Sequence, residues 1–429
     1  MKRNPRPLFA ALLLAGCGGA DARTIPVTSD SALASAIAGA KSGDRIVLSP
    51  GNYGQLSIGG RAIEGTPVTI TAAATAKRPV VSNVDVDRSR GWIVEGLEIG
   101  GSSGRRGRVV FVTNSTDIGI LNNFVRGSNL NNDPWDDDVT GIGVRNSERV
   151  EVSRNRIRDS GTGVSVAEST DVLFAGNSIA FVREGSQWVA TRRTTLRCNR
   201  ISHIFPNLLL KEHPDAIQGW PNRTGNNTDT LIEGNVLMLG GPRAVHGIFM
   251  QGRITPDGSG KPASVRNLTV RDNIYYGSAL HGISFGGLEN ALIEHNTVLP
   301  SPHSQTEPRP VRSEDGRRTA ALMPRIRVYP DLSTGIVRGN IAPSITIPPG
   351  VRGENNLIVS GNSQNGKAWR KLFTTPPTGD DPPLESFLVD PASPAGKAGQ
   401  GARSICGNLL PPAVDVPSGL DPSSPAWPG

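Results

Sequence analysis

The sequence predicts an all-β fold: a single-stranded right-handed parallel β-helix, or solenoid, with an N-terminal capping helix. Two observations support this prediction. The 429 residues include 51 glycines and 34 prolines but only 5% aromatic residues, a composition typical of short strands joined by many turns. The chain also carries an internal repeat with a basic period of 22 residues, which is typical of stacked coils.

The repeat consists of a short apolar strand, a polar turn, a second β-rich strand and then Asn-x-apolar. Clear copies are residues 140–157 and 162–179. The asparagines of successive copies are Asn155, Asn177, Asn199, Asn235, Asn273, Asn296 and Asn340. Their separations are 22, 22, 36, 38, 23 and 44 residues, so some coils carry insertions. We expect the asparagines to stack at one corner and hydrogen-bond along the stack, which is a structural role.

The N-terminal residues 1–22 are predicted to be a signal peptide or lipoprotein leader with a short linker, because a basic start precedes an apolar stretch. Residues 14–17 (LAGC) resemble a bacterial lipobox, in which Cys17 is lipidated, whereas residues 20–22 offer an ordinary cleavage site. Both alternatives predict export, to the periplasm, the outer membrane through an N-terminal lipid, or the extracellular space. No apolar run reaches the ~18 residues of a membrane span.

The remaining chain is divided into a β-helix domain, 23–410, and a Pro/Ser-rich C-terminal tail, 411–429. Residues 29–41 are Ala-rich and begin with Ser and Asp, which predicts the capping helix. The Pro/Arg-rich stretch 300–327 breaks the period and is interpreted as a long surface loop. We expect Cys198 and Cys406 to be separate buried thiols rather than a disulfide framework.

The formal net charge is +7, and removing Lys2, Arg3 and Arg6 with the leader leaves 7 − 3 = +4. A moderate positive charge favours polyanionic partners. No nucleic-acid motif and no basic run interleaved with aromatics is found, which argues against nucleic acid. We therefore expect an acidic polysaccharide as the partner of a monomeric protein.

Three segments of the N-terminal part carry a resemblance to a known superfamily. Residues 43–53 (GDRIVLSPGNY), 66–71 (TPVTIT) and 92–97 (WIVEGL) resemble the pectate-lyase-like β-helix superfamily, and in particular its alginate lyase and chondroitinase B group. The resemblance implies the fold. It implies no catalytic residues here, because the Lys and Arg motifs of that group are not found beyond residue 100. The segment 384–399 resembles the closing coil of such proteins.

Aligning the coils on their apolar strands gives the strongest functional signal. Thr140-Gly-Ile, Thr162-Gly-Val, Asp215-Ala-Ile, His246-Gly-Ile and His281-Gly-Ile share one register. Because neighbouring strands lie about 4.8 Å apart, Asp215, His246 and His281 are predicted to form a column on consecutive coils, with His213 nearby. Since Ile217 points inward, Asp215 reaches the outside only if the chain bends just before the strand.

Other features around the column are interpreted as parts of a groove. The small residues 216, 247 and 282 would let a sugar chain approach the backbone, and insertions at 203–230 and 252–266 would wall the groove. Gln218, Trp220 and Gln251 are candidate substrate contacts, while Trp135 and Trp188 either stack on sugars or pack. The acidic run Asp136, Asp137 and Asp138 is a candidate Ca²⁺ site, although no other cofactor is expected.

The residue inventory favours β-elimination at a uronic acid, in which a base removes the proton beside the carboxyl group and positive charge neutralises that group. His246 or His213 is the candidate base, Arg243 or Lys211 the carboxylate partner, and Asp215 the group that orients a histidine, with His281 beside them. A uronate C5-epimerase needs the same first step.

Two further alternatives stay open. Polygalacturonases resemble the sequence around Asp215, where a catalytic acid precedes a small and an apolar residue. They have aspartates on adjoining coils, whereas this chain has His246 on the next one, so a hydrolase would need another carboxylate facing Asp215. A non-catalytic polysaccharide-binding surface protein is the remaining alternative.

Overall fold

The computed structural model of the protein describes most of residues 22–413. The residues outside the description within that range are 76, 102–106, 128, 130, 132, 207–214, 224, 242, 257–261, 306–322, 331–332, 360–370 and 405. The predicted leader with Cys17 and most of the tail 411–429 also lie outside the described residues. Among the described residues, no helix is both long and apolar enough to cross a membrane.

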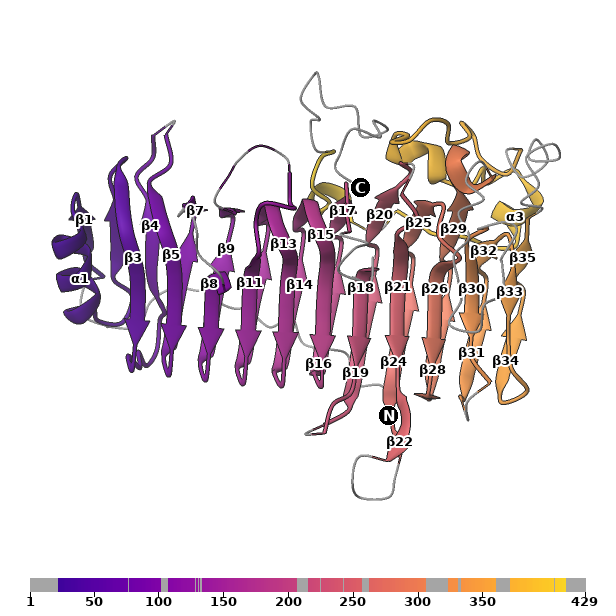
Figure 1. The fold of residues 1–429 in the computed structure, drawn as a ribbon, viewed down its shortest axis with the longest axis horizontal. Helices are drawn as coiled ribbons and strands as arrows, with labels where there is room; N and C mark the ends of the chain where they lie inside the picture. The colour runs from indigo at the N-terminus through magenta and orange to yellow at the C-terminus, as the bar shows by residue number, and fades with distance from the viewer. Residues whose placement is uncertain are drawn as a thin grey trace.

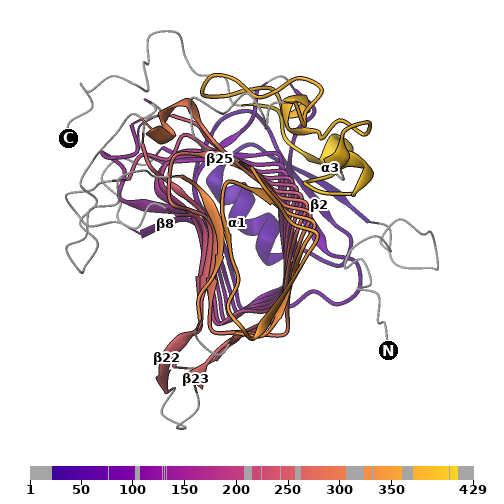
Figure 2. The same ribbon diagram turned by 90° about the vertical axis from the view of Figure 1, so that its right-hand side faces the viewer.

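The strands stack in parallel into one elongated coil, which Figure 1 shows from the side and Figure 2 along its length. One side is a 14-stranded sheet, here called sheet A. Its strands are β1 (Thr24–Val27), β2 (Arg45–Leu48), β4 (Val68–Ala72), β6 (Arg90–Glu95), β9 (Thr116–Leu121), β12 (Glu148–Ser153), β14 (Thr170–Ala175), β16 (Arg192–Arg197), β19 (Asn227–Glu233), β24 (Val265–Arg271), β27 (Leu288–Glu289), β28 (Ala291–Glu294), β31 (Gly335–Arg338) and β34 (Val351–Glu354).

A 19-stranded sheet forms the other two sides. The flank consists of β7 (Glu98–Gly100), β10 (Phe124–Arg126), β17 (Arg200–Ser202), β20 (Val236–Leu239), β25 (Ile274–Gly277), β29 (Thr297–Pro300), β32 (Ile341–Ala342) and β35 (Leu357–Ile358). The front consists of β8 (Gly107–Thr113), β11 (Val139–Arg145), β18 (Asp215–Trp220), β21 (His246–Gln251), β26 (His281–Gly286), β30 (Arg325–Val328) and β33 (Ile345–Thr346). Four strands run through both: β3 (Asn52–Gly59), β5 (Val80–Asp87), β13 (Arg156–Ala167) and β15 (Ser178–Val189).

The core is a continuous file of aliphatic side chains inside the coil. Ile217, Ile248, Ile283 and Ile326 occupy equivalent positions on β18, β21, β26 and β30, and each is at most 1% exposed. Burial of such side chains stabilises the stack by roughly 1.5–3 kcal/mol each. The predicted parallel β-helix is thereby confirmed by the strand pairing of the chain itself.

The predicted capping helix is α1 (Asp30–Ala38), and it covers the first coil. Ser29 is the N-cap, and its hydroxyl accepts a hydrogen bond from the Ala32 N–H at 3.2 Å. Leu33 and Ile37 are buried in the core, so the helix closes the apolar end that the stack would otherwise expose.

The predicted asparagine ladder is present. Asn155 Nδ2 donates to Asn177 Oδ1 at 3.0 Å, and Asn177 Nδ2 donates to Asn199 Oδ1 at 3.0 Å. The ladder continues through Asn235, Asn273, Asn296, Asn340 and Asn356. These bonds satisfy amides that are buried at the corner between sheet A and the flank, which fixes the register of the coils.

The C-terminal residues 371–413, apart from 405, form a strap that runs back along the flank instead of adding the expected closing coil (Figure 1). The strap contains the short helices η3 (Leu384–Phe387), α3 (Pro394–Lys397) and η4 (Gly407–Leu409). Cys406 is disulfide-bonded to Cys198, 208 residues earlier. The prediction of two separate thiols was therefore wrong, because the two cysteines meet only through this reversal of the chain.

The interpretation of residues 300–327 as a loop needs a correction at both ends. The short helix η2 (Pro302–Gln305) follows β29, and Arg325–Val328 is strand β30 of the front. The residues between them lie outside the described part of the chain. The hairpin β22 (Arg253–Pro256) and β23 (Pro262–Ala263) is antiparallel and projects from the end of β21 (Figure 2).

Candidate functional site

The predicted column is formed by the front strands at the point where each strand begins. Asp215 pairs with His246 in the parallel register of β18 and β21. Ile248 pairs with Ile283, which aligns His246 with His281, and the two imidazole centroids lie 4.8 Å apart at 84°. The predicted alignment of these three residues is confirmed, whereas their chemical roles are not tested by it.

The column residues precede the inward isoleucines at an even spacing, so the bend that strand parity requires stays a prediction. The register passes from Asp215↔His246 to Ile217↔Ile248, so two positions separate an inward isoleucine from a side chain of the column. A Cβ on Gly247 would lie 2.1 Å from Gly282 O and 2.4 Å from the Tyr275 ring. Gly247 thus has an internal packing role, and the expectation that the small residues let a sugar approach the backbone stays a prediction.

Asp215 and His246 form a hydrogen-bonded pair. Asp215 Oδ1 lies 3.1 Å from His246 Nδ1, the Asp215 side chain is 1% exposed and that of His246 is 26% exposed. A carboxylate accepts only, so Nδ1 of the imidazole donates and Nε2 is left as the acceptor in the neutral form. The other oxygen, Oδ2, is buried and has no hydrogen-bond partner in the described part of the chain.

His281 is a neutral neighbour of this pair. Burial, together with the nearby His246, Arg325 and Arg327, lowers the pKa of His281 to about 3, and burial is the largest cause. Its Nδ1 lies 2.9 Å from Ser284 Oγ. A group this hard to protonate contributes hydrogen bonding rather than charge or proton uptake near neutral pH.

Two charged residues of the column were not predicted. Ser186 pairs with Ile217, so Glu184 on β15 lies beside Asp215, and His281 pairs with Arg325 on β30. The described column therefore runs Thr140, Thr162, Glu184, Asp215, His246, His281 and Arg325. The 22-residue spacing from Thr162 to Glu184 was the available signal.

A second row follows the column along the front strands. Gln187 pairs with Gln218, Gln218 with Phe249 and Ser284 with Arg327, while Trp220 and Gln251 come later on their strands. Gln218 is 8% exposed, and Trp220 and Gln251 are half-buried. The three predicted contact residues thus share the front with the column. The hairpin β22–β23 begins at the opposite end of β21 from His246, so it does not wall the column.

The other two candidate tryptophans, Trp135 and Trp188, lie in different environments. Trp188 is 1% exposed and its Nε1 donates to Ser186 Oγ at 3.1 Å, so it packs in the core. Trp135 is half-buried, and its Nε1 donates to Phe205 O at 2.8 Å. Arg243 lies over the rings of Trp135 and Phe205, with its guanidinium carbon 5.5 and 5.8 Å from their centroids.

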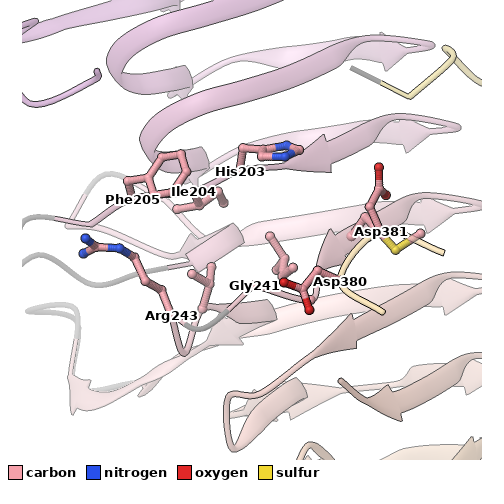
Figure 3. A pocket seen from close by; sticks show the side chains of 11 residues that line it. His203, Ile204, Phe205, Gly241, Arg243, Asp380 and Asp381 are labelled. Carbon is pink, nitrogen blue, oxygen red and sulfur yellow. The ribbon is translucent and has the colours of Figure 1, made fainter. Parts of the chain in front are cut away.

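Arg243 belongs to a pocket at the corner that precedes the column. The pocket lies between the flank and the strap, and Figure 3 shows Arg243 and Phe205 on one side and Asp381 on the other. His203 also lines it, and burial lowers the pKa of that histidine. Two other predicted residues, Lys211 and His213, lie outside the described residues.

The predicted Ca²⁺ ligands do not converge. Asp136 Oδ2 accepts from Asn129 Nδ2 and Asn131 Nδ2, whereas Asp138 Oδ1 pairs with Arg183 at 2.8 Å. Asp137 is 2% exposed and accepts from the Asn129 N–H. Across the described ranges, no cluster of three or more His, Cys, Asp or Glu is arranged to hold a metal ion.

A family model described as periplasmic copper-binding protein (NosD) matches residues 57–200. The match covers less than half of the chain and ends before Asp215. It therefore includes the N-terminal coils and none of the aligned histidines. No curated protein matches this chain.

Solved structures similar to this chain include polysaccharide lyases and a polygalacturonase. The family 6 alginate lyase AlyGC is 14% identical over 78% of this chain, with a TM-score of 0.38, and this chain spans 51% of its length. A family 28 exopolygalacturonase of Yersinia enterocolitica is 10% identical over 80% of this chain and 77% of its own, with a TM-score of 0.41. Pectate lyase Pel9A is 12% identical over 88% and 91%, with a TM-score of 0.36. At such scores the likeness carries no argument about activity, and the fold is shared by lyases and hydrolases alike.

Proposed function

We propose that this protein is an exported enzyme that cleaves a uronate-containing polysaccharide by β-elimination on the front of the β-helix. The observation that carries the proposal is the Asp215–His246 hydrogen bond in line with His281 and Arg325. It combines an oriented base with a fixed positive charge, which are the two requirements of elimination beside a carboxylate.

In the proposed reaction, His246 Nε2 takes the proton on the carbon that bears the uronate carboxyl group. The electron pair of that C–H bond forms the new carbon–carbon double bond, and the bond to the glycosidic oxygen breaks. The leaving oxygen then takes a proton from the imidazolium or from water. The Asp215 carboxylate orients the ring and stabilises its protonated form.

Arg325 is the candidate partner of the substrate carboxylate. It is half-buried at the end of the column, and its Nε is buried without a hydrogen-bond partner in the described part of the chain. Arg327 follows on the same strand, with its guanidinium 3.9 Å from the Tyr329 ring centroid. Two guanidinium groups beside the neutral His281 favour an anionic sugar over a neutral one.

Export is supported by the disulfide. A bond between Cys198 and Cys406 forms and persists in oxidising compartments such as the periplasm. The basic and apolar N-terminal residues agree with this assignment, and lipidation of Cys17 would attach the protein to the outer membrane.

A glycoside hydrolase is the second candidate, and Glu184 is the observation that favours it. Glu184 and Asp215 lie on adjoining strands, whose spacing is about 4.8 Å. A retaining hydrolase needs two carboxyl groups about 5–5.5 Å apart. The hydrogen bond that holds Asp215 on His246 makes elimination the better-supported reaction.

The test is incubation of the purified protein with alginate, polygalacturonate, hyaluronate and chondroitin sulfate, with and without Ca²⁺. We expect an ultraviolet absorbance rise from the unsaturated uronic product with one of them, and none with His246→Ala. New reducing ends without absorbance, lost in Glu184→Gln, would replace the lyase with the hydrolase. Uronate inversion without chain cleavage would indicate the C5-epimerase.

A further inference from the structure

The pocket beside the column is built from two distant parts of the chain. Its floor is formed by Leu239 of the flank strand β20 together with Phe205 and Val245 from the segments that follow β17 and β20, and its far wall is Asp380 and Asp381 of the strap. Val245 directly precedes His246, so the pocket adjoins the candidate base. A ligand in this pocket would therefore be next to a sugar bound at the column.

The strap is seated on the flank by specific contacts. Tyr276 donates its hydroxyl to Gly379 O at 2.7 Å, and its ring meets Phe387 edge to face with centroids 5.4 Å apart. Gly240 makes this approach possible, because a Cβ there would lie 2.0 Å from Asp380 O. The pocket thus depends on a glycine at 240 and on a docked strap.

The charges in the pocket are divided between its two sides. Arg243 is the cation, at the Phe205 side, whereas the two aspartates stand on the strap side (Figure 3). Asp381 is fixed by Arg200 at 3.2 Å and Asp380 by His303 at 2.9 Å. Carboxylate oxygens held in this way can still accept hydrogen bonds from hydroxyl groups.

We propose that this pocket is a subsite for one hexuronate unit, with its carboxylate at Arg243 and its hydroxyl groups at Asp380 and Asp381. The apolar floor, including the Phe205 ring, suits the C–H face of a sugar ring. A pocket for a polyanion would not be expected to contain two aspartates, and a pocket for an apolar ligand would not be expected to contain an arginine. The inference rests on the proposed polysaccharide substrate, but binding can be measured without turnover.

The experiment is ligand-observed NMR titration of the full oxidised protein with galacturonate, glucuronate and mannuronate, and with glucose as the neutral sugar. We expect the protein to bind at least one hexuronate and to bind it more tightly than glucose. Arg243→Gln should weaken that binding about tenfold or more, through loss of a charged hydrogen bond, while Arg352→Gln, an exposed arginine at the last coils, should leave it unchanged.

A glycine pair provides the matched control for the strap. Gly240→Ala should displace the strap and weaken hexuronate binding, whereas Gly59→Ala, at the exposed end of β3, whose Cβ would also meet nothing within 4 Å, should bind like the parent protein. Thermal unfolding would verify that each variant is folded. If Gly240→Ala does not fold, Arg243→Gln still tests the subsite.

Absence of hexuronate binding, equal binding of glucose, or unchanged binding in both Gly240→Ala and Arg243→Gln would overturn the subsite. These outcomes are separate from the activity assay. Hexuronate binding that depends on Arg243, without cleavage of any polymer, would contradict the proposed lyase activity and leave the subsite. Polymer cleavage, together with hexuronate binding that is unchanged in both Gly240→Ala and Arg243→Gln, would overturn the subsite and leave the lyase.

Discussion

Asp215 and His246 face each other on adjoining strands, with Oδ1 of the carboxylate 3.1 Å from Nδ1 of the imidazole. Neither residue lies near the other in sequence. The parallel register of β18 and β21 brings them together, with the Asp215 side chain 1% exposed and that of His246 26% exposed. The stacking of the coils therefore creates the pair. Because Asp215 and His246 contact each other across adjoining coils, a substitution on one coil changes the chemistry of the residue on the next.

The first prediction concerns the role of Asp215. Asp215→Asn should lower kcat by two to four orders of magnitude, because an amide can present the wrong hydrogen-bonding group to Nδ1 and cannot stabilise an imidazolium. The pH–rate profile should change shape as well. Asp229→Asn, at an exposed position of sheet A, is the control and should retain full activity. Equal rates for the two variants would remove Asp215 from the mechanism.

The second prediction concerns His281 and acid stability. The unfolded chain protonates this histidine near 6.5, whereas the folded protein does so only near 3. Between these values the unfolded state binds more protons, so this group makes the free energy of unfolding decrease as pH falls. The slope approaches about 1.4 kcal/mol per pH unit.

Replacing His281 by Asn should remove that contribution. Urea unfolding at several pH values between 7 and 4 would measure it, and the difference between the slopes of the two proteins isolates His281. Identical slopes would show that the histidine is as easily protonated in the folded protein as in the unfolded one.

The third prediction concerns the disulfide. The Cys198–Cys406 bond closes a loop of 208 residues, and loop-entropy arguments assign such a bond about 5 kcal/mol. In Cys198→Ser/Cys406→Ser, we expect the strap to detach while the coils persist, because the coils have their own core and hydrogen-bonded ladder. Limited proteolysis should then cut within 371–413, with the circular dichroism of the β-sheets retained. Protection equal to that of the parent protein would show that packing alone holds the strap.

The fold was predictable because each coil repeats the same local signal. A period of 22 residues and an asparagine at one corner specify both the stacking direction and the register, so the alignment of Asp215, His246 and His281 followed from sequence. Cys198 and Cys406 gave no such signal, because their meeting depends on a chain reversal that follows no repeat. The same holds for the pocket, one wall of which comes from the strap.

The two column residues that were not predicted, Glu184 and Arg325, were missed for different physical reasons. Glu184 was missed because the residue at the inward position two places later is Ser186 rather than an aliphatic one. That serine is fully buried, and its hydroxyl can be accommodated there because it donates to Ala216 O and accepts from Trp188 Nε1. Arg325 was missed because the Pro/Arg-rich composition before it hides the short strand β30.

The fourth prediction tests the asparagine ladder. Asn235 donates from Nδ2 to Leu196 O and accepts at Oδ1 from the Asn199 backbone and side chain, with no exposed surface. Asn235→Ala leaves these groups buried without partners and should cost about 2–4 kcal/mol. Asn52→Ala, at an exposed strand end, should stay within about 0.5 kcal/mol of the parent. Equal urea midpoints for both variants would contradict a structural ladder.

The fifth prediction distinguishes packing from substrate access at the small residues that follow the column. Gly247→Ala introduces a Cβ 2.1 Å from Gly282 O, so neighbouring coils must separate, and overpacking of this kind costs about 1–3 kcal/mol. Gly241→Ala has no such contact and should unfold at the urea concentration of the parent protein. If Gly247→Ala instead keeps full stability and loses only polymer cleavage, the glycine serves the approach of a sugar after all. A loss of stability with a proportionate loss of activity assigns it to the interior, where the close passage of two backbones leaves no room for a side chain.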